Sequence, residues 1–172
     1  VRLSEEPFDI RYTRILDISY LRRWIQDPKV LRWFSMSTPE EIEQALAVWM
    51  SFARYNASLT AVIDREPCGV ATLFLPYYKK TIHHCLFKIC VAPEYQGRGI
   101  GSALIKNIKH LAKTQFNMEA IYAESFDGNP LIPLLKKFDF HEFVKQDNYV
   151  KTETGYLARV LLEAVLQEGP SL

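Results

Sequence analysis

The sequence predicts an α+β (mixed α/β) domain with a partly antiparallel central sheet. Three observations support this fold class: helical and strand-like periodicities are mixed, several strand patterns follow one another in the middle of the chain, and a glycine-rich strand–loop–helix segment comes after them. The chain has 172 residues, about one domain's worth, and no linker rich in proline or glycine divides it. We expect a single domain over residues 1–172.

The N-terminal third predicts one strand and two helices. Apolar residues alternate with charged ones over residues 8–12, as in a short strand. Asp17 can cap a helix that ends at Asp27-Pro28, because a residue before proline disfavours the helical conformation. Thr38-Pro39-Glu40-Glu41 combines an N-cap threonine, a proline at the first helical position and a capping-box glutamate. Apolar residues then continue at helical spacing to Phe52, which predicts the second helix.

The remaining elements are predicted from apolar runs and the turn residues between them. Strands are expected over residues 59–63, 69–75, 82–91 and 120–125, with a turn at 64–67, and helices from the glycine-rich loop to about Lys113 and over 130–138. Residues 156–165 fit a helical stripe and also one face of a strand, and periodicity alone slightly favours the helix.

The composition argues against several classes of protein. Hydrophobic residues make up 48% and charged residues 24%, which is typical of globular chains rather than disordered ones. The 21 Lys and Arg residues nearly balance the 20 Asp and Glu residues, so no basic field attracts nucleic acid. No apolar run approaches the roughly 20 residues that cross a bilayer. We expect no nucleic-acid partner and no membrane association.

The cysteines indicate free thiols. Cys68, Cys85 and Cys90 are odd in number and show no CxxC spacing, which favours a reducing, cytoplasmic location. Cys85 and Cys90 are separated by an odd number of residues and would point to opposite faces of one strand. They therefore could not share a metal ion, and we expect no metal.

The most informative segment runs from Phe87 to Ser102, where a strand enters a loop with three glycines and an amphipathic helix follows. Gly97, Gly99 and Gly101 let backbone N–H groups approach a ligand and adopt positive φ. The helix N-terminus adds unpaired donors and a partial positive charge, which together predict a phosphate or pyrophosphate site. A tight turn that merely needs glycine is the alternative interpretation.

Two other phosphate-binding loops do not fit this segment. A Walker loop requires Gly-Lys-Ser/Thr, which is absent. A dinucleotide fingerprint requires a third glycine where Ser102 stands, and it normally follows the first strand of a βαβ unit.

Residues 91–101, Val-Ala-Pro-Glu-Tyr-Gln-Gly-Arg-Gly-Ile-Gly, resemble the acetyl-CoA signature of the GNAT acetyltransferase superfamily. That signature is Gln/Arg-x-x-Gly-x-Gly/Ala after a strand ending in Val-x-Pro, and Gln96, Gly99 and Gly101 match it. The resemblance implies an acyl-CoA N-acyltransferase fold: a mostly antiparallel twisted sheet of about six or seven strands with a splayed strand pair, flanked by about four helices. It also leads us to expect a strand at 156–164, against the periodicity.

The resemblance implies further that acetyl-CoA is the acetyl donor. In this family the strand before the loop splays from its neighbour, and the pantetheine arm pairs with its exposed backbone. An asparagine at the start of the next helix lies near the pantetheine. The matching cofactor residues are Ile89, Cys90 and Val91 on the strand, Gln96, Gly97, Arg98, Gly99, Ile100, Gly101 and Ser102 in the loop, with Arg98 adding a charge-assisted contact, and Asn129.

Direct attack on a thioester requires a neutral amine, whereas a lysine-like amine with a pKa of about 10.4 is mostly protonated at neutral pH. A general base is therefore needed. Glu124 lies five residues before Asn129, a spacing that resembles the catalytic glutamate of ribosomal-protein acetyltransferases, and is the first candidate. His84 is the second. The alternatives are a hydrated strand-end carboxylate and a surface histidine.

The general acid of the family is missing. Its motif, Leu-Tyr-x-x-x-Gly-Phe, corresponds to residues 134–140, where Leu135 replaces the tyrosine and Asp139 the glycine. Solvent, Tyr122 or Tyr149 could protonate the departing thiolate instead.

We expect an N-acetyltransferase that acts on a primary amine, either a protein N-terminus or a small molecule, as a monomer or homodimer. The segment from Asp27 through the following hairpin resembles, more weakly, the ribosomal-protein N-terminal acetyltransferase branch. The acceptor groove is expected around Trp33, Phe34, the helix after Thr38 and the Tyr77-Tyr78 loop. The alternatives are a non-catalytic acyl-CoA-binding regulatory module on the same fold and an unrelated nucleotide-binding domain.

Overall fold

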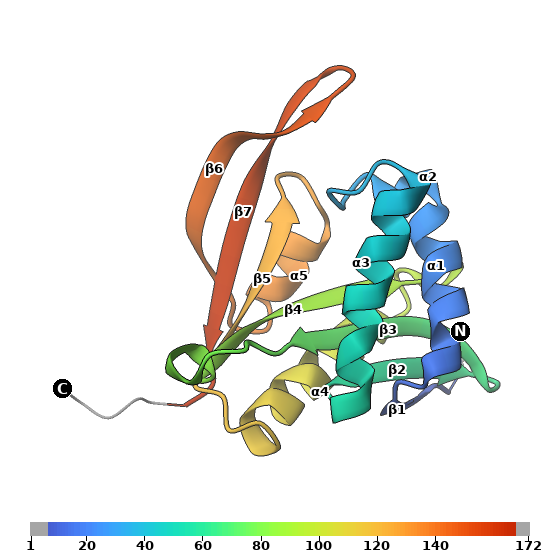
Figure 1. Cartoon of the computed structure of the whole chain (residues 1–172), viewed down its shortest axis with the longest axis vertical. Helices are drawn as coiled ribbons and strands as arrows, with labels where there is room; N and C mark the ends of the chain where they lie inside the picture. Colours follow the sequence, from blue (N-terminus) through green and yellow to red (C-terminus); the bar gives the residue numbers. More distant parts are fainter. Residues whose placement is uncertain (1–6, 168–172) are drawn as a thin grey trace, which may run out of the picture.

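The computed structural model describes residues 7–167, which form one seven-stranded sheet with helices on both of its faces (Figure 1). The strand order is β1-β2-β3-β4-β5-β7-β6, and every neighbouring pair is antiparallel except β4 and β5. This confirms the predicted mixed, mostly antiparallel fold. The strands are β1 (Asp9–Tyr12), β2 (Ser58–Ile63), β3 (Glu66–Phe74), β4 (His84–Val91), β5 (Ala120–Phe126), β6 (His141–Thr152) and β7 (Gly155–Val165).

The helices follow the predicted segments closely, with one short helix that was not expected, α2. The α-helices are α1 (Ile18–Gln26), α2 (Pro28–Leu31), α3 (Pro39–Ser51), α4 (Ile100–Thr114) and α5 (Leu131–Lys136). Single 3-10 turns are η1 (Ile15–Asp17), η2 (Phe52–Tyr55), η3 (Lys79–Thr81) and η4 (Pro93–Tyr95).

The sheet separates two apolar cores. Helices α1 to α3 cover one face, and their buried residues include Trp24 and Trp49. Helices α4 and α5 cover the other face, where Leu104 packs. Cys85 belongs to the α4 core and Cys90 to the α1–α3 core, as their odd spacing along β4 predicts.

Helix α3 begins with the predicted capping box. The Glu41 N–H donates to Thr38 Oγ1 at 3.2 Å, and Glu41 Oε2 accepts from the Thr38 N–H at 3.1 Å. Asp27 ends α1 in an extended conformation and then caps α2, where its Oδ1 accepts from the Lys29 N–H at 2.9 Å. The end of α1 and the start of α3 depend on local contacts, which explains why the sequence predicted them.

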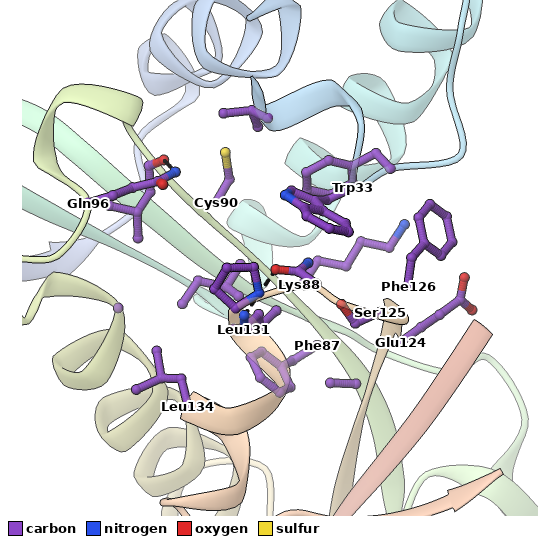
Figure 2. A pocket seen from close by; sticks show the side chains of 18 of the residues that line it. Trp33, Phe87, Lys88, Cys90, Gln96, Glu124, Ser125, Phe126, Leu131 and Leu134 are labelled. Carbon is purple, nitrogen blue, oxygen red and sulfur yellow. Dashed lines mark hydrogen bonds between the residues drawn. The ribbon is translucent and has the colours of Figure 1, made fainter. Parts of the chain in front are cut away.

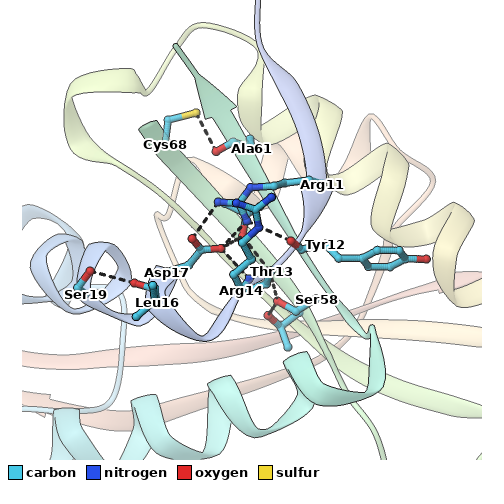
Figure 3. Close-up of polar contacts among 12 residues, drawn as sticks. Arg11, Tyr12, Thr13, Arg14, Leu16, Asp17, Ser19, Ser58, Ala61 and Cys68 are labelled. Carbon is cyan, nitrogen blue, oxygen red and sulfur yellow. Dashed lines mark hydrogen bonds and ion pairs between the residues drawn. The ribbon is translucent and has the colours of Figure 1, made fainter. Parts of the chain in front are cut away.

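The predicted cap of α1 by Asp17 is wrong. Asp17 has helical backbone angles, φ −67° and ψ −15°, because η1 leads directly into α1, and its side chain makes no cap hydrogen bond to α1. The carboxylate instead accepts from the Arg14 N–H at 2.9 Å and pairs with Arg11 Nη1 at 2.7 Å (Figure 3). Thr60 donates to the same carboxylate at 2.9 Å.

A chain of buried hydroxyl groups continues from this carboxylate across the sheet. Thr60 Oγ1 also lies 2.9 Å from Thr13 Oγ1. Thr13 Oγ1 in turn lies 2.7 Å from Ser58 Oγ (Figure 3). Ser58 Oγ lies 2.6 Å from Thr72 Oγ1, and the Trp49 Nε1 group donates to that oxygen at 2.8 Å. The polar side chains of this chain, from Asp17 to Trp49, are thus satisfied by one another.

The C-terminal segment is a strand, which confirms the expectation drawn from the resemblance and contradicts the helical periodicity. β7 pairs with β5 on one side and with β6 on the other. β6 was not predicted. Its side chains are exposed along nearly the whole strand, so it carries no alternation of buried and exposed positions.

The starts of β3 and β4 differ from the prediction. The turn between β2 and β3 contains only Asp64 and Arg65, both with left-handed φ, so β3 already begins at Glu66. β4 begins at His84 rather than at residue 82. Gly69 on β3 explains how α4 packs so closely: an added Cβ there would lie 2.9 Å from Leu104 Cδ1.

β4 and β5 diverge, as expected. They pair over only three positions, from His84 opposite Ala120 to Leu86 opposite Tyr122. Beyond Leu86, β4 stays paired with β3 and β5 stays paired with β7. The two strands therefore separate and leave an opening in the middle of the sheet (Figure 1).

Candidate active site

The opening between β4 and β5 contains a cavity of about 540 Å³ (Figure 2). Its walls come from both strands, from the α2 region, from the glycine-rich loop and from the start of α5. Figure 2 shows Gln96 and Leu134 at one end and Trp33, Phe126 and Glu124 at the other. The cavity therefore joins the glycine-rich loop to the candidate base.

β4 turns alternate peptide groups toward this cavity. The Ala92 N–H donates to the Cys68 carbonyl of the β3 side at 2.8 Å. Because peptide groups alternate in an antiparallel pair, those of Cys90 face β3, and those of Ile89 and Val91 face the opening. No strand pairs with them there, since the β4–β5 ladder ends at Leu86. Ile89 and the Val91 N–H thus present an open strand edge, while the Val91 carbonyl accepts from Gln96. Cys90 lines the cavity without offering its peptide groups.

The glycine-rich loop closes one end of the cavity. Gly97 and Gly99 have φ of 78° and 83°, and an added Cβ at either would meet no protein atom within 4 Å. Glycine is therefore required by the backbone angle and not by crowding. The Gln96 side chain is held by its Nε2, which donates to the Val91 carbonyl at 3.3 Å.

Helix α4 starts with open donors. The Ala103 N–H donates to the Gly99 carbonyl at 3.1 Å. The amides of residues 100–102 precede this first bond and have no acceptor within the helix. A helix N-terminus of this kind binds anions, and α4 is fifteen residues long.

The loop residues divide into two groups. Gln96, Gly97, Gly99, Gly101 and Ser102 line the cavity. The Ile100 side chain is buried in the α4 core, and the Arg98 guanidinium lies 5.3 Å from the centre of the Tyr95 ring. Neither of these two side chains lines the cavity.

Asn129 lines the cavity at the start of α5. Its Oδ1 accepts from the Leu131 N–H at 3.0 Å, and its own N–H donates to the Phe126 carbonyl at 3.0 Å. The Asn129 side chain is thereby fixed to the first residue of α5, and its backbone is held to the last residue of β5.

Glu124 lies on β5 at the opposite end of the cavity from the loop (Figure 2). Its side chain is 30% exposed, and its Oε2 is 3.5 Å from Arg159 Nη1 of β7. The carboxylate is thus accessible to a ligand, and its contact with Arg159 orients it.

His84 does not line the cavity. It lies at the closed end of the divergence, where β4 still pairs with β5, and its ring contacts His83 and Tyr122. The sequence placed it on the strand correctly but could not show that the strands separate only beyond Leu86. We therefore withdraw His84 as a candidate base.

The motif position of the family's general acid and the two tyrosines considered in its place also lie outside the cavity. Leu135 is completely buried in the α4 core, and Asp139 adopts a φ of 65°, the conformation that glycine favours. Neither Tyr122 nor Tyr149 lines the cavity, and burial raises the pKa of Tyr122.

Only some of the residues expected to form the acceptor groove line the cavity. Trp33 and Phe34 line the cavity, whereas Tyr77 and Tyr78 do not and are 90% and 77% exposed. The two tyrosines belong to the loop between β3 and β4. This loop leads into the start of β4, where β4 is still paired with β5.

Lys88 and Ser125 are among the cavity residues that the sequence did not reveal. Lys88 lies on β4 and faces the cavity, and a lysine within the apolar run 82–91 was the signal that could have revealed it. Ser125 is 2% exposed, and its Oγ has no hydrogen-bond partner among the described residues. Nothing in the sequence distinguishes this serine from a core residue.

Within residues 7–167, no cluster of three or more His, Cys, Asp or Glu side chains could hold a metal ion. None of the helices in that range is both long and apolar enough to span a membrane.

Solved structures show the same fold. yncA from Salmonella typhimurium, solved with its cofactor acetyl-CoA, has a TM-score of 0.79 at 18% identity, covering 95% of this chain and 96% of that one. An N-acetyltransferase from Staphylococcus aureus Mu50 has a TM-score of 0.81 at 19% identity, covering 94% and 99%. A ribosomal-protein-alanine N-acetyltransferase from Brucella melitensis has a TM-score of 0.78 at 18% identity, covering 91% and 99%.

The ribosomal-protein branch is not singled out, because acetyltransferases of other kinds are equally similar. No curated protein matches the chain. The model of the acetyltransferase (GNAT) family matches residues 18–140, which include the diverging strands and the glycine-rich loop. The chain is therefore a member of the acetyltransferase (GNAT) family.

Proposed function

We propose that this protein transfers an acetyl group from acetyl-CoA to a primary amine by direct attack on the thioester. One observation carries the proposal: a single cavity joins the anion-binding start of α4 to the Glu124 carboxylate across an unpaired strand edge. Bound acetyl-CoA would supply the activated acetyl group.

The residues of this cavity fit such a donor. The amides of Ile100 to Ser102 and the left-handed Gly97 and Gly99 suit a pyrophosphate. The outward peptide groups of Ile89 and Val91 suit the amide-bearing pantetheine arm, because an extended chain can pair with a free strand edge. Asn129 stands beside this path.

Glu124 is the proposed base. An ionised carboxylate at the cavity wall can accept a proton from the acceptor ammonium, directly or through a water molecule. The Val91 N–H is the donor placed to polarise the acetyl carbonyl. With Leu135 buried and both Tyr122 and Tyr149 outside the cavity, solvent is the proposed proton source for the thiolate.

A panel of amines tests the function. Purified protein is mixed with acetyl-CoA and with peptide N-termini, polyamines, aminoglycosides or amino acids, and free thiol is followed with time. Amine-dependent thiol release by the wild-type protein, absent from the Gly99→Asp variant, is the expected result.

The replacement of the family's tyrosine by Leu135 supports a second candidate, a regulatory module that binds acyl-CoA without turnover. Tight CoA binding with no thiol release from any amine would favour that candidate. Preference for NAD or ATP over CoA would contradict both.

A further inference from the structure

Lys88 lies on the wall of the cavity and forms no ion pair within residues 7–167. It shares its face of β4 with Cys90, the face that α1 to α3 cover. Its Nζ lies 5.0 Å from the centre of the Phe74 ring, and among residues 7–167 no carboxylate is within ion-pair distance of it. Figure 2 shows its side chain extending between Trp33 and Phe126.

Without a bound ligand, this environment disfavours the charged form of Lys88. Lys88 is only partly exposed, and an ammonium that loses part of its hydration is stabilised by an opposite charge or by hydrogen-bond acceptors. Burial accordingly lowers the pKa of Lys88, and the negative charge of Glu124 opposes that effect only in part. A leucine or methionine would fill the same space without this cost, so the ammonium calls for an anion from a ligand.

The other charged side chains that line the cavity also favour a ligand with an anionic group. Lys29, Lys88 and Glu124 are the ionisable lysine and carboxylate side chains that line it. Glu124 already faces Arg159, so the charge left uncompensated is positive. A polyamine or another purely cationic acceptor would meet two lysines, whereas a molecule with both an amine and a carboxylate would match Lys88 and Glu124 at once.

We propose that Lys88 binds a carboxylate of the acceptor, so that the acceptor is a primary amine that also carries a carboxylate, such as a free amino acid. This inference rests on the proposed acetyl transfer. Lys88 and Glu124 stand on the two strands that diverge, and the acceptor lies between them with its carboxylate toward β4 and its amine toward β5. The same arrangement disfavours peptide N-termini, whose α-carboxyl group is an uncharged amide.

Matched acceptors provide the test. kcat/KM is measured by thiol release for free amino acids, for their primary amides, which stand in for peptide N-termini, and for the decarboxylated amines. The wild-type protein is expected to prefer the amino acids by at least about tenfold, the size of one charge-assisted contact. Lys88→Met should remove this preference, Lys88→Arg should retain part of it, and Lys113→Met, at the exposed end of α4, should leave it unchanged.

Calorimetry separates this inference from the proposed function. Amino acids and their amides are titrated into protein saturated with CoA, which measures acceptor binding without turnover. Tighter binding of the amino acid that is lost in Lys88→Met, with CoA affinity unchanged, supports the carboxylate contact even if no amine releases thiol. Equal binding of acid and amide, or a preference that survives in Lys88→Met, overturns it, including when acetyl transfer itself is observed.

Discussion

Arg159 of β7 reaches Glu124 of β5, with Nη1 3.5 Å from Oε2. The same guanidinium donates to Gln146 Oε1 at 2.8 Å and lies 4.3 Å from the centre of the Tyr149 ring, both on β6. The two charged side chains are 26% and 30% exposed, so solvent screens their attraction. Their contact orients the proposed base more than it stabilises the fold, and it makes β6 part of the site.

Glu124→Gln should lower kcat at pH 7 by about 10²- to 10⁴-fold, because the amide cannot accept a proton from the acceptor. The loss should narrow toward pH 10, where more of the amine is already neutral. Thiol release measured from pH 6 to 10 checks this. Glu163→Gln, an exposed carboxylate on β7, is the matched control. An equal loss at every pH would remove Glu124 from the proton transfer.

Gly99→Asp should weaken CoA binding by at least about 100-fold, since it adds a negative charge where the phosphates would bind and strains a left-handed backbone. Gly99→Asn tolerates that backbone better and adds no charge, so it should bind more tightly than the aspartate variant. Gly101→Ala should bind nearly normally, because its Cβ would lie 3.4 Å from Leu134 Cδ2. Calorimetry with CoA measures all three, and equal affinities of the two Gly99 variants would contradict the phosphate assignment.

Asp17→Asn should destabilise the fold by roughly 2–3 kcal/mol at pH 7, the value of a hydrogen-bonded buried charge. Burial opposes the ionisation of Asp17, but its bonds from Arg11, Arg14 and Thr60 outweigh burial and lower its pKa. A lowered folded-state pKa stabilises the protein above the unfolded value of about 3.9, and this contribution is lost as the pH falls toward the folded pKa. The difference between the variant and the wild type should therefore shrink in acid.

Urea unfolding at pH 7 and at about pH 3 measures that difference. Glu43→Gln removes the exposed ion pair with Arg22 and should change stability far less. A difference for Asp17→Asn that stays the same in acid would show that the ionised carboxylate is not the cause.

The three cysteines should react at least about 100-fold more slowly in the native protein than after unfolding. Burial raises the pKa of Cys68 to about 11 and those of Cys85 and Cys90 to about 12, so few thiolates exist at pH 8. A colorimetric thiol reagent added with and without denaturant measures this. Rapid labelling of a native cysteine would contradict the burial and would also add background to the thiol-release assay.

Local signals predicted most helices correctly. The capping box at Thr38 and Glu41 and the Asp27-Pro28 break act within one turn of helix, so neighbouring residues suffice to define them. Asp17 shows the limit of such signals. Its carboxylate pairs with Arg11 and accepts a hydrogen bond from Thr60. Thr60 lies 43 residues away along the chain, so no local signal could reveal this contact.

The strand conformation of β6 and β7 is decided by the strands with which they pair. Residues of β7 carried both periodicities, and pairing on both sides with β5 and β6 decides for the strand. β6 has no buried face, so no pattern in the sequence could reveal it. Strand state is decided by hydrogen bonds to other segments, whereas helical hydrogen bonds stay within the segment.

For the site, the sequence alone determined the glycine loop before α4, because it depends on spacing within one segment, and the family resemblance singled out Glu124 by its spacing from Asn129. The tertiary structure decided the rest. The divergence of β4 from β5 beyond Leu86 keeps His84 out of the cavity, leaves peptide groups of Ile89 and Val91 without a partner strand and opens the cavity that Lys88 and Glu124 both line. The direction in which two strands part is a property of the whole sheet, and no local pattern of residues encodes it.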